Sequence, residues 1–179
     1  SDAITWTWQD NSDNEEGFYA WSDPGADEPT TLRTLAARDA VSWTQNGLAA
    51  NTLYSFMTAA MNYSGTSAKT AAYSAWTLAQ APTAPVVGTP TASSLEVAIG
   101  DGDGNPVITE YAIKNVTAGA WVQADGTIAA APTYRTREDW GTTVVTGLDP
   151  DTTQEFAVMA RNGAGVETLL GPDAEGTTL

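Results

Sequence analysis

The residues whose types and spacing come closest to a chemical site lie in an acidic turn near the middle of the chain. Asp101, Asp103 and Asn105 are spaced two apart, and calcium prefers several oxygen ligands from a flexible turn. The EF-hand pattern is not completed, because Pro106 stands where that loop has glycine and no glutamate occupies the twelfth position. Glycine and aspartate are also common in plain turns. Calcium at these three residues is therefore the one cofactor that the sequence suggests, with an ordinary turn as the alternative.

A second acidic stretch lies near the N-terminus and is the weaker candidate; it contains Asp10, Asp13, Glu15 and Glu16. The whole chain is acidic, with 7 Lys and Arg against 22 Asp and Glu and a net charge of −15. Such a charge repels phosphate backbones and anionic lipids and attracts divalent cations. The balance argues against nucleic acid as a partner, although a solvated exterior is the ordinary reason for an acidic surface.

The absence of two residue types limits the enzyme chemistry that is available. The chain has no Cys and no His, which removes thiol nucleophiles, disulfides, ordinary zinc sites and any Ser-His-Asp relay. Paired carboxylates could still act as acid and base, but among 22 acidic residues a pair carries no signal without a cleft. We therefore expect no enzymatic activity. The sequence also lacks a run of about 18 apolar residues that would span a membrane.

Aromatic residues form the other candidate surface. Tyr19 and Trp21 alternate with smaller or buried positions, which directs both to the outer face of a sheet, where Tyr73 or Trp76 could join them. Exposed aromatics stack on sugars or become buried in protein contacts, and partial burial under loops is the alternative. We favour a protein contact because a sugar site also needs convergent polar groups. The candidate interface residues are Ile4, Trp6, Tyr19, Trp21, Tyr73 and Trp76.

Two N-glycosylation sequons are present, NYS at Asn62 and NVT at Asn115. Both are predicted to lie in loops. Chance is the alternative explanation in a chain this rich in Ser and Thr.

Short alternating segments, separated by Gly, Pro, Asn and Asp, must position these candidates. Residues 4–8 (ITWTW) and 94–99 (SLEVAI) alternate apolar and polar side chains, as half-buried strands do. The first pattern places Trp6 and Trp8 in a core. Because no segment shows a sustained helical period, the sequence predicts an all-β fold.

The order of the segments is duplicated. GLAANTLYSFMTAAMN (47–62) has the same outline as GLDPDTTQEFAVMARN (147–162). The segment AQAPTAP (79–85) is the Pro-rich junction between equivalent parts, and short Pro-rich spacers are stiff. We therefore predict two domains, residues 1–80 and 81–179.

The chain resembles the fibronectin type III family over nearly all of both halves. That family has a Leu at the end of its fifth strand, then a Thr, and a Tyr six places after the Leu; Leu48, Thr52 and Tyr54 match this pattern. The Tyr is the tyrosine corner of Greek-key sandwiches, whose hydroxyl returns to nearby backbone. Gln154 takes its place in the second half. The resemblance implies two tandem Greek-key β-sandwiches, of the kind found in bacterial, archaeal or phage surface proteins.

Only the second half shows a candidate for the family's first strand, in PVVGTPTAS (85–93). The first half begins almost directly with the segment that resembles the second strand. An unpaired edge would present free N–H and C=O groups, with apolar side chains beneath it meeting water. Two interpretations stay open: the sequence is a fragment or tolerates the edge, or a neighbouring subunit donates a strand.

The resemblance assigns no activity, because this sandwich supports many unrelated roles. We predict a non-catalytic structural or adhesive unit outside the cell or at its surface. Its expected partners are proteins, either copies of itself or neighbouring modules, in a surface layer, filament, appendage or multidomain adhesin. The alternatives are a carbohydrate-binding or spacer module of a secreted polysaccharide-active enzyme and a virion surface or tail component.

Overall fold

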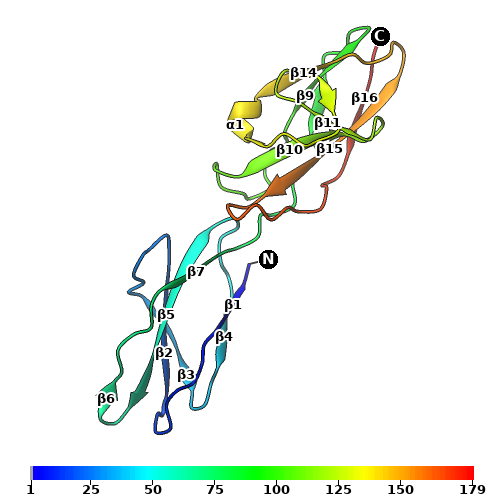
Figure 1. Cartoon of the computed structure of the whole chain (residues 1–179). Helices are drawn as coiled ribbons and strands as arrows, with labels where there is room; N and C mark the ends of the chain where they lie inside the picture. Colours follow the sequence, from blue (N-terminus) through cyan, green and yellow to red (C-terminus); the bar gives the residue numbers. More distant parts are fainter. Residues whose placement is uncertain (1) are drawn as a thin grey trace. The chain divides into compact units, whose positions relative to one another are not determined.

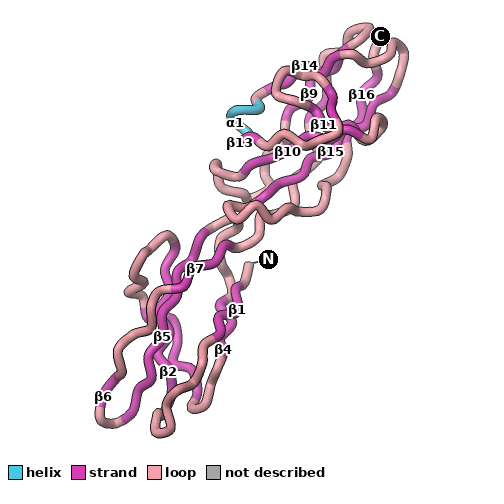
Figure 2. Tube along the Cα trace, in the orientation of Figure 1, coloured by secondary structure: helices cyan, strands magenta, loops and turns pink. Residues whose placement is uncertain are grey.

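The computed structural model describes residues 2–179, and its regular secondary structure is almost entirely β-strand, with loops between the strands (Figures 1 and 2). The helical exception among the described residues is the four-residue α1 (Arg137–Trp140). The prediction of an all-β fold is therefore confirmed. The chain divides into two compact units, one ending at Thr77 and the other beginning at Leu78, whereas the sequence analysis placed the boundary between Gln80 and Ala81.

The first unit is a sandwich of two antiparallel sheets. The smaller sheet pairs β1 (Ile4–Thr7) with β4 (Ser42–Gln45). The larger sheet has the order β3, β2, β5, with two further strands that also pair with β5. Its strands are β3 (Leu32–Ala37), β2 (Gly17–Pro24), β5 (Leu53–Asn62), β6 (Gly65–Thr66) and β7 (Tyr73–Trp76).

The second unit repeats this plan with one strand more in each sheet. That sheet has the order β14, β9, β8, from β14 (Thr142–Thr146), β9 (Ser94–Ala98) and β8 (Val86–Gly88). The larger sheet has the order β12, β11, β10, β15, β16, and β13 also pairs with β10. Its strands are β12 (Ile128–Ala129), β11 (Ala120–Val122), β10 (Glu110–Asn115), β13 (Arg135–Thr136), β15 (Thr153–Arg161) and β16 (Ala174–Thr177).

Each unit has its own apolar core between its two sheets. In the first unit the Trp6 and Phe56 rings stack with centroids 5.0 Å apart, and Trp8 packs beside them on Phe56. The core of the second unit is larger, and Leu95, Val97 and Ile99 of the SLEVAI segment all contribute to it. The predicted alternation is confirmed in both segments, because a strand directs every second side chain to the same face: Trp6 is buried between two exposed threonines, and half-buried residues separate the buried Leu95, Val97 and Ile99.

The turn between β4 and β5 is a tyrosine corner, as predicted. Tyr54 is buried, and its hydroxyl accepts a hydrogen bond from the Ala49 N–H at 3.2 Å. The hydroxyl of Thr77 accepts a second bond from the Thr52 N–H at 2.9 Å and donates to the Ala49 carbonyl at 2.7 Å. Backbone groups that leave the sheet at this crossing therefore still have partners.

At the equivalent turn of the second unit, Gln154 replaces the corner Tyr. Gln154 is buried where the Tyr would stand; its amide oxygen accepts from Asn115 Nδ2 at 2.9 Å, and its amide nitrogen donates to Thr152 Oγ1 at 3.2 Å. Thr178 takes the part of Thr77, because its hydroxyl accepts from the Thr152 N–H and donates to a corner carbonyl. A Thr hydroxyl that bonds the backbone on both sides of the turn is thus common to both units, whereas the corner Tyr is present only in the first.

We expect Tyr54→Phe to lower the free energy of unfolding of the first unit by about 1 kcal/mol, the usual net value of one hydrogen bond. The ring stays in the core, so the loss reports the bond to Ala49 alone. Urea unfolding followed by tryptophan fluorescence measures it. Tyr19→Phe is the matched control, since Tyr19 lies half-buried on the outer face of β2; an equal loss in both variants would contradict the assignment.

Candidate functional site

The first unit has a strand edge that no other strand covers. Within residues 2–179, β1 pairs with β4 and with no strand on its other side. Its counterpart in the second unit, β9, lies between β8 and β14. Within residues 2–179, the position of the family's first strand is therefore filled by β8 in the second unit and is open in the first.

The register of β1 identifies the backbone groups that face this open edge. The Trp8 N–H donates to the Val41 carbonyl at 3.0 Å, and residues of an antiparallel pair bond their partner strand alternately. Trp6 therefore bonds toward β4, while Thr5 and Thr7 direct their N–H and C=O groups to the open side. Both are exposed. These four groups are available to an added strand.

The side chains beneath the edge are better covered than the sequence suggested. Trp6 is only 2% exposed, and its Nε1 donates to Gln45 Oε1 at 3.0 Å. The prediction that Trp6 lies in a core is confirmed, because its ring stacks on Phe56 and meets the Tyr73 ring edge to face. Ile4 is half-buried. A partner would thus touch the backbone of β1 rather than the Trp6 ring.

Tyr73 lies on the opposite side of its sheet from the one predicted. It pairs with Phe56 in the β5–β7 register and meets the Trp6 ring edge to face at 6.4 Å. It therefore points into the sandwich and does not join Tyr19 and Trp21. Yet it is 69% exposed, which is unusual for an inward-facing ring and follows from the open edge of β1.

The same place in the second unit is filled by β8. The Tyr73–Phe56 pair corresponds to Ala174–Phe156 on β16 and β15. Beside Ala174, Gly176 lies so close to β8 that an added Cβ would come within 2.6 Å of Val87 Cγ1. In that unit β8 therefore packs on the inner face of β16, where the first unit exposes Tyr73.

Tyr19 and Trp21 lie on the outer face of β2, as their alternation predicts. Both are half-buried, and their rings are 5.7 Å apart. The ammonium of Lys69 lies 4.4 Å from the centroid of the Trp21 ring. Trp76 faces the same side but pairs with Leu53, four positions along β5 from the partner of Trp21. The structure therefore does not bring Trp76 together with this aromatic pair.

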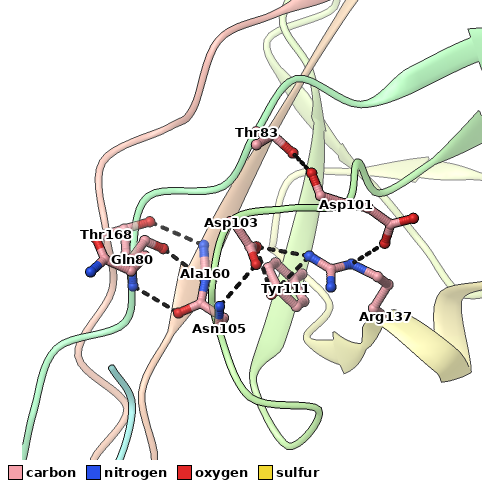
Figure 3. A network of polar contacts seen from close by, with 9 residues as sticks. All are labelled: Gln80, Thr83, Asp101, Asp103, Asn105, Tyr111, Arg137, Ala160 and Thr168. Atoms are coloured by element: carbon pink, nitrogen blue, oxygen red, sulfur yellow. Dashed lines mark hydrogen bonds and ion pairs between the residues drawn. The ribbon is translucent and has the colours of Figure 1, made fainter. Parts of the chain in front are cut away.

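The predicted calcium residues belong to a network of hydrogen bonds and ion pairs (Figure 3). Asp103 Oδ2 accepts from the Tyr111 hydroxyl at 2.7 Å and from Arg137 Nη2 at 2.8 Å, and Oδ1 accepts from the Asn105 N–H at 3.1 Å. Asp101 is exposed and lies 3.6 Å from Arg137 Nε. Calcium at this loop stays a prediction, and the ion would have to displace Arg137 from Asp103.

Asn105 uses its amide to hold the start of the second unit. Its Oδ1 accepts from the Gln80 N–H at 2.8 Å, and its Nδ2 donates to the Gln80 carbonyl at 3.0 Å. Thr83 binds the same loop through the Asp101 carbonyl at 3.1 Å. These bonds give Asp101, Asp103 and Asn105 a structural role that needs no ion.

The electrostatics of the network favour a charged Asp103 and a neutral Tyr111. Burial opposes ionisation of Asp103, but hydrogen bonds from Tyr111, Asn105 and Arg137 outweigh it and hold the pKa of Asp103 below its ordinary value. Burial raises the pKa of Tyr111, and its bond to the Asp103 anion raises it further. Asp103 is thus an anion whose side chain is only 1% exposed, with Arg137 as its counter-charge.

Sequence reasoning did not find Arg137, because the helix that carries it is too short for periodicity to reveal. Thr136 caps this helix by accepting from the Asp139 N–H at 3.1 Å. The buried Trp140 anchors it by donating from Nε1 to the Tyr111 carbonyl at 2.7 Å. A Thr two residues before adjacent acidic residues is the cap signal that could have indicated the helix.

Two residues of the weaker acidic stretch lie close to a third carboxylate, which comes from the turn between β3 and β4. Asp10, Glu15 and Asp39 each place a carboxylate oxygen within 4.8 Å of the others. Asp13 and Glu16 are exposed and are not members of this group. Asp39 follows Glu15 by 24 residues, so no local spacing could indicate the cluster.

The two sequons differ in their surroundings. Asn62 ends β5 and is half-buried, and a glycan there stays a prediction. The placement of Asn62 and Asn115 in loops is wrong, because each is the last residue of a strand. Asn115 is fully buried and donates its amide Nδ2 to Gln154. The folded domain therefore offers no room for a glycan at that atom.

Comparison with solved structures places the fold among tandem fibronectin type III domains. A segment of two such domains from chicken tenascin matches with a TM-score of 0.59 and 13% identity, over 98% of this chain and 90% of that chain. The FN1–FN3 domains of chicken CNTN1 match with 14% identity over 99% of this chain and 60% of that one, at a TM-score of 0.40. At these identities the likeness concerns the fold alone.

No family model matches the amino-acid sequence, and no curated protein matches it either. Among the described residues, no helix is long and apolar enough to cross a membrane. In fold, the chain thus consists of two tandem β-sandwiches like those of fibronectin type III domains.

Proposed function

We propose that this chain is a non-catalytic structural or adhesive module that acts outside the cell through contacts with other proteins. Its setting would be a surface layer, filament, appendage or multidomain adhesin. The tandem sandwich fold, the acidic surface and the lack of Cys and His support this function. The observation that carries it is the open edge of β1.

In this proposal a neighbouring subunit donates a β-strand that pairs with β1. The strand would bond the N–H and C=O groups of Thr5 and Thr7 and would cover Tyr73, as β8 covers the inner face of β16 in the second unit. Main-chain bonds would supply affinity and the exposed Tyr73 ring would supply specificity. The partner tested first is a second copy of this chain.

The test is self-association of the whole chain, measured by sedimentation over a range of concentrations. Thr5→Pro removes a donor on the open side and is tolerated on an edge strand. We expect it to weaken association about tenfold, as the loss of one backbone bond implies. Thr5→Val keeps the N–H and is the matched control. In the associated form the amides of Thr5 and Thr7 should exchange slowly with deuterium.

Two outcomes would contradict strand donation between copies. One is a chain that stays monomeric up to its solubility limit, with the Thr5 and Thr7 amides exchanging fast throughout. The other is association that Thr5→Pro and Thr5→Val leave equally strong.

The adjacent rings of Tyr19 and Trp21 favour one alternative, a carbohydrate-binding or spacer module of a secreted polysaccharide-active enzyme. Aromatic faces stack on sugar rings, although Lys69 lies over the Trp21 ring. Glycan-array binding that is lost in Trp21→Ala would favour this alternative.

A further inference from the structure

Three carboxylates from three separate segments meet at one end of the first unit. Asp10 follows β1, Glu15 precedes β2, and Asp39 lies in the turn between β3 and β4. Each contributes one oxygen to a group whose members lie within 4.8 Å of one another. Like charges at this separation repel strongly, so the arrangement calls for a compensating positive charge.

Glu15 is the buried member of the group, and one of its two carboxylate oxygens lacks a hydrogen-bond partner among the described residues. Glu15 is 1% exposed; its Oε1 accepts from the Asp39 N–H at 3.2 Å, and its Oε2 is buried with no hydrogen-bond partner among the described residues. A buried carboxylate oxygen without a partner is destabilising and needs an explanation. A bound cation would both reduce the repulsion among the three carboxylates and give the Glu15 Oε2 atom a partner.

Neighbouring side chains do not supply this charge. The Ser12 hydroxyl lies near Glu15 and helps to lower its pKa, after the larger effect of the Glu15 backbone N–H. By hydrogen-bond geometry, however, that hydroxyl donates to Asn14 Oδ1 at 3.5 Å. Arg38 also favours the charged form of Glu15, but it makes none of the ion pairs found among the described residues. Glu15 is thus an anion without a direct counter-ion from the protein.

We propose that Asp10, Glu15 and Asp39 bind a calcium ion. Calcium takes carboxylate oxygens at about 2.3–2.6 Å, so oxygens on opposite sides of one ion lie about 4.6–5.2 Å apart. The oxygens of the group all lie within 4.8 Å of one another, a separation that one calcium ion can span. Magnesium demands near-ideal octahedral geometry and gives up its water reluctantly, whereas calcium accepts irregular coordination. Water and backbone carbonyls complete the coordination.

The position of the site gives the ion a structural task. Asp10 lies three residues after the end of β1 in the two-stranded sheet, and Glu15 lies two residues before the start of β2 in the facing sheet. One ion would therefore connect the two layers at this end of the sandwich. Glu15 also lines a shallow groove with Ser12, Asn14 and Asn62, which gives a path to solvent.

The experiment is a calcium titration of the whole chain, freed of metal by chelation and kept in about 150 mM salt to screen non-specific attraction. Amide shifts in two-dimensional NMR report the site, and calorimetry reports the affinity. We expect saturable shifts at residues 10–16 and 38–40, with a dissociation constant of about 10⁻⁴–10⁻³ M, as in extracellular calcium modules. Calcium should also raise the melting temperature of the first unit, and magnesium should bind more weakly.

Variants separate the site from the general acidity of the surface. Asp39→Asn changes an exposed member and should weaken calcium binding at least about tenfold, and Glu15→Gln should do the same. Asp13→Asn and Glu16→Gln remove the same charge from exposed neighbours outside the group and should change affinity less than about twofold. Because Asp39→Asn leaves the buried Glu15 in place, it tests the site even where Glu15→Gln impairs folding.

The proposal would be overturned by the absence of shifts at these residues in about 10 mM calcium, well above the expected dissociation constant. Shifts centred on Asp101–Asn105, or equal losses of affinity in Asp13→Asn and Asp39→Asn, would overturn it as well. None of these outcomes bears on strand donation at β1, which uses the backbone N–H and C=O groups of Thr5 and Thr7 and none of the three carboxylates.

Discussion

Trp6→Ala is expected to remove a large part of the stability of the first unit while the second unit keeps its native spectrum. Trp6 is 2% exposed and stacks on Phe56 with an interplanar angle of 7°. Removing a buried Trp side chain costs about 3–5 kcal/mol, whereas a domain of this size has a total stability of about 4–11 kcal/mol. Amide dispersion in NMR, followed separately for residues before and after Thr77, measures the outcome.

Trp21→Ala is the control for this prediction. Trp21 lies half-buried on the outer face of the same unit, so its loss removes less contact and should lower the free energy of unfolding by about 1 kcal/mol. Similar losses in the two variants would show that the Trp6–Phe56 stack is not the centre of the core.

Arg137→Met is expected to destabilise the second unit by about 3–5 kcal/mol, because it leaves a buried charge without its partner. Arg137 donates to Asp103 Oδ2 at 2.8 Å and to the Tyr111 hydroxyl at 3.2 Å, and the Asp103 side chain is 1% exposed. Met keeps the length of the aliphatic stem, so the loss reports the charge. Urea unfolding at pH 7 measures it.

Asp101→Asn is the matched control, since the Asp101 side chain is 92% exposed and pairs with the same guanidinium at 3.6 Å. An exposed pair of this kind contributes less than about 0.5 kcal/mol. An Asp101→Asn variant as unstable as Arg137→Met would contradict the central role of Asp103.

The ion pair between Asp103 and Arg137 should make the stability of the second unit depend on pH in the acidic range. The folded pKa of Asp103 is lowered, so its contribution is fully present above its unfolded value of about 3.9 and is lost as the pH falls through the folded value. Arg137→Met should reduce this loss of stability in acid.

The features that were predictable from the sequence are local. The alternation in residues 4–8 and the spacing of Leu48 and Tyr54 each depend on a few adjacent residues, and the structure confirms both. The replacement of the corner Tyr by Gln154 was visible in the sequence, but the hydrogen-bond partner of Gln154 was not. That partner is Asn115, which lies 39 residues away.

The candidate sites were harder to predict because their members come together only across the fold. The spacing of Asp101, Asp103 and Asn105 is that of a calcium loop. Arg137, however, lies 34 residues beyond Asp103 in sequence and forms an ion pair with its carboxylate. Asp10 and Glu15 have no such spacing, yet the turn at Asp39 completes a cluster around them.

The all-β class, the duplication and the strand faces of Trp6, Tyr19 and Trp21 were predictable from residue patterns, and the resemblance to the fibronectin type III family added the tyrosine corner. Strand periodicity and turn chemistry are short-range, so they can be read along the chain. Tertiary structure alone decided that Tyr73 faces inward, that Asn115 is buried, and which acidic loop holds an unpartnered carboxylate. These outcomes depend on strand register and on contacts between residues far apart in sequence, since a shift of one residue reverses every side chain.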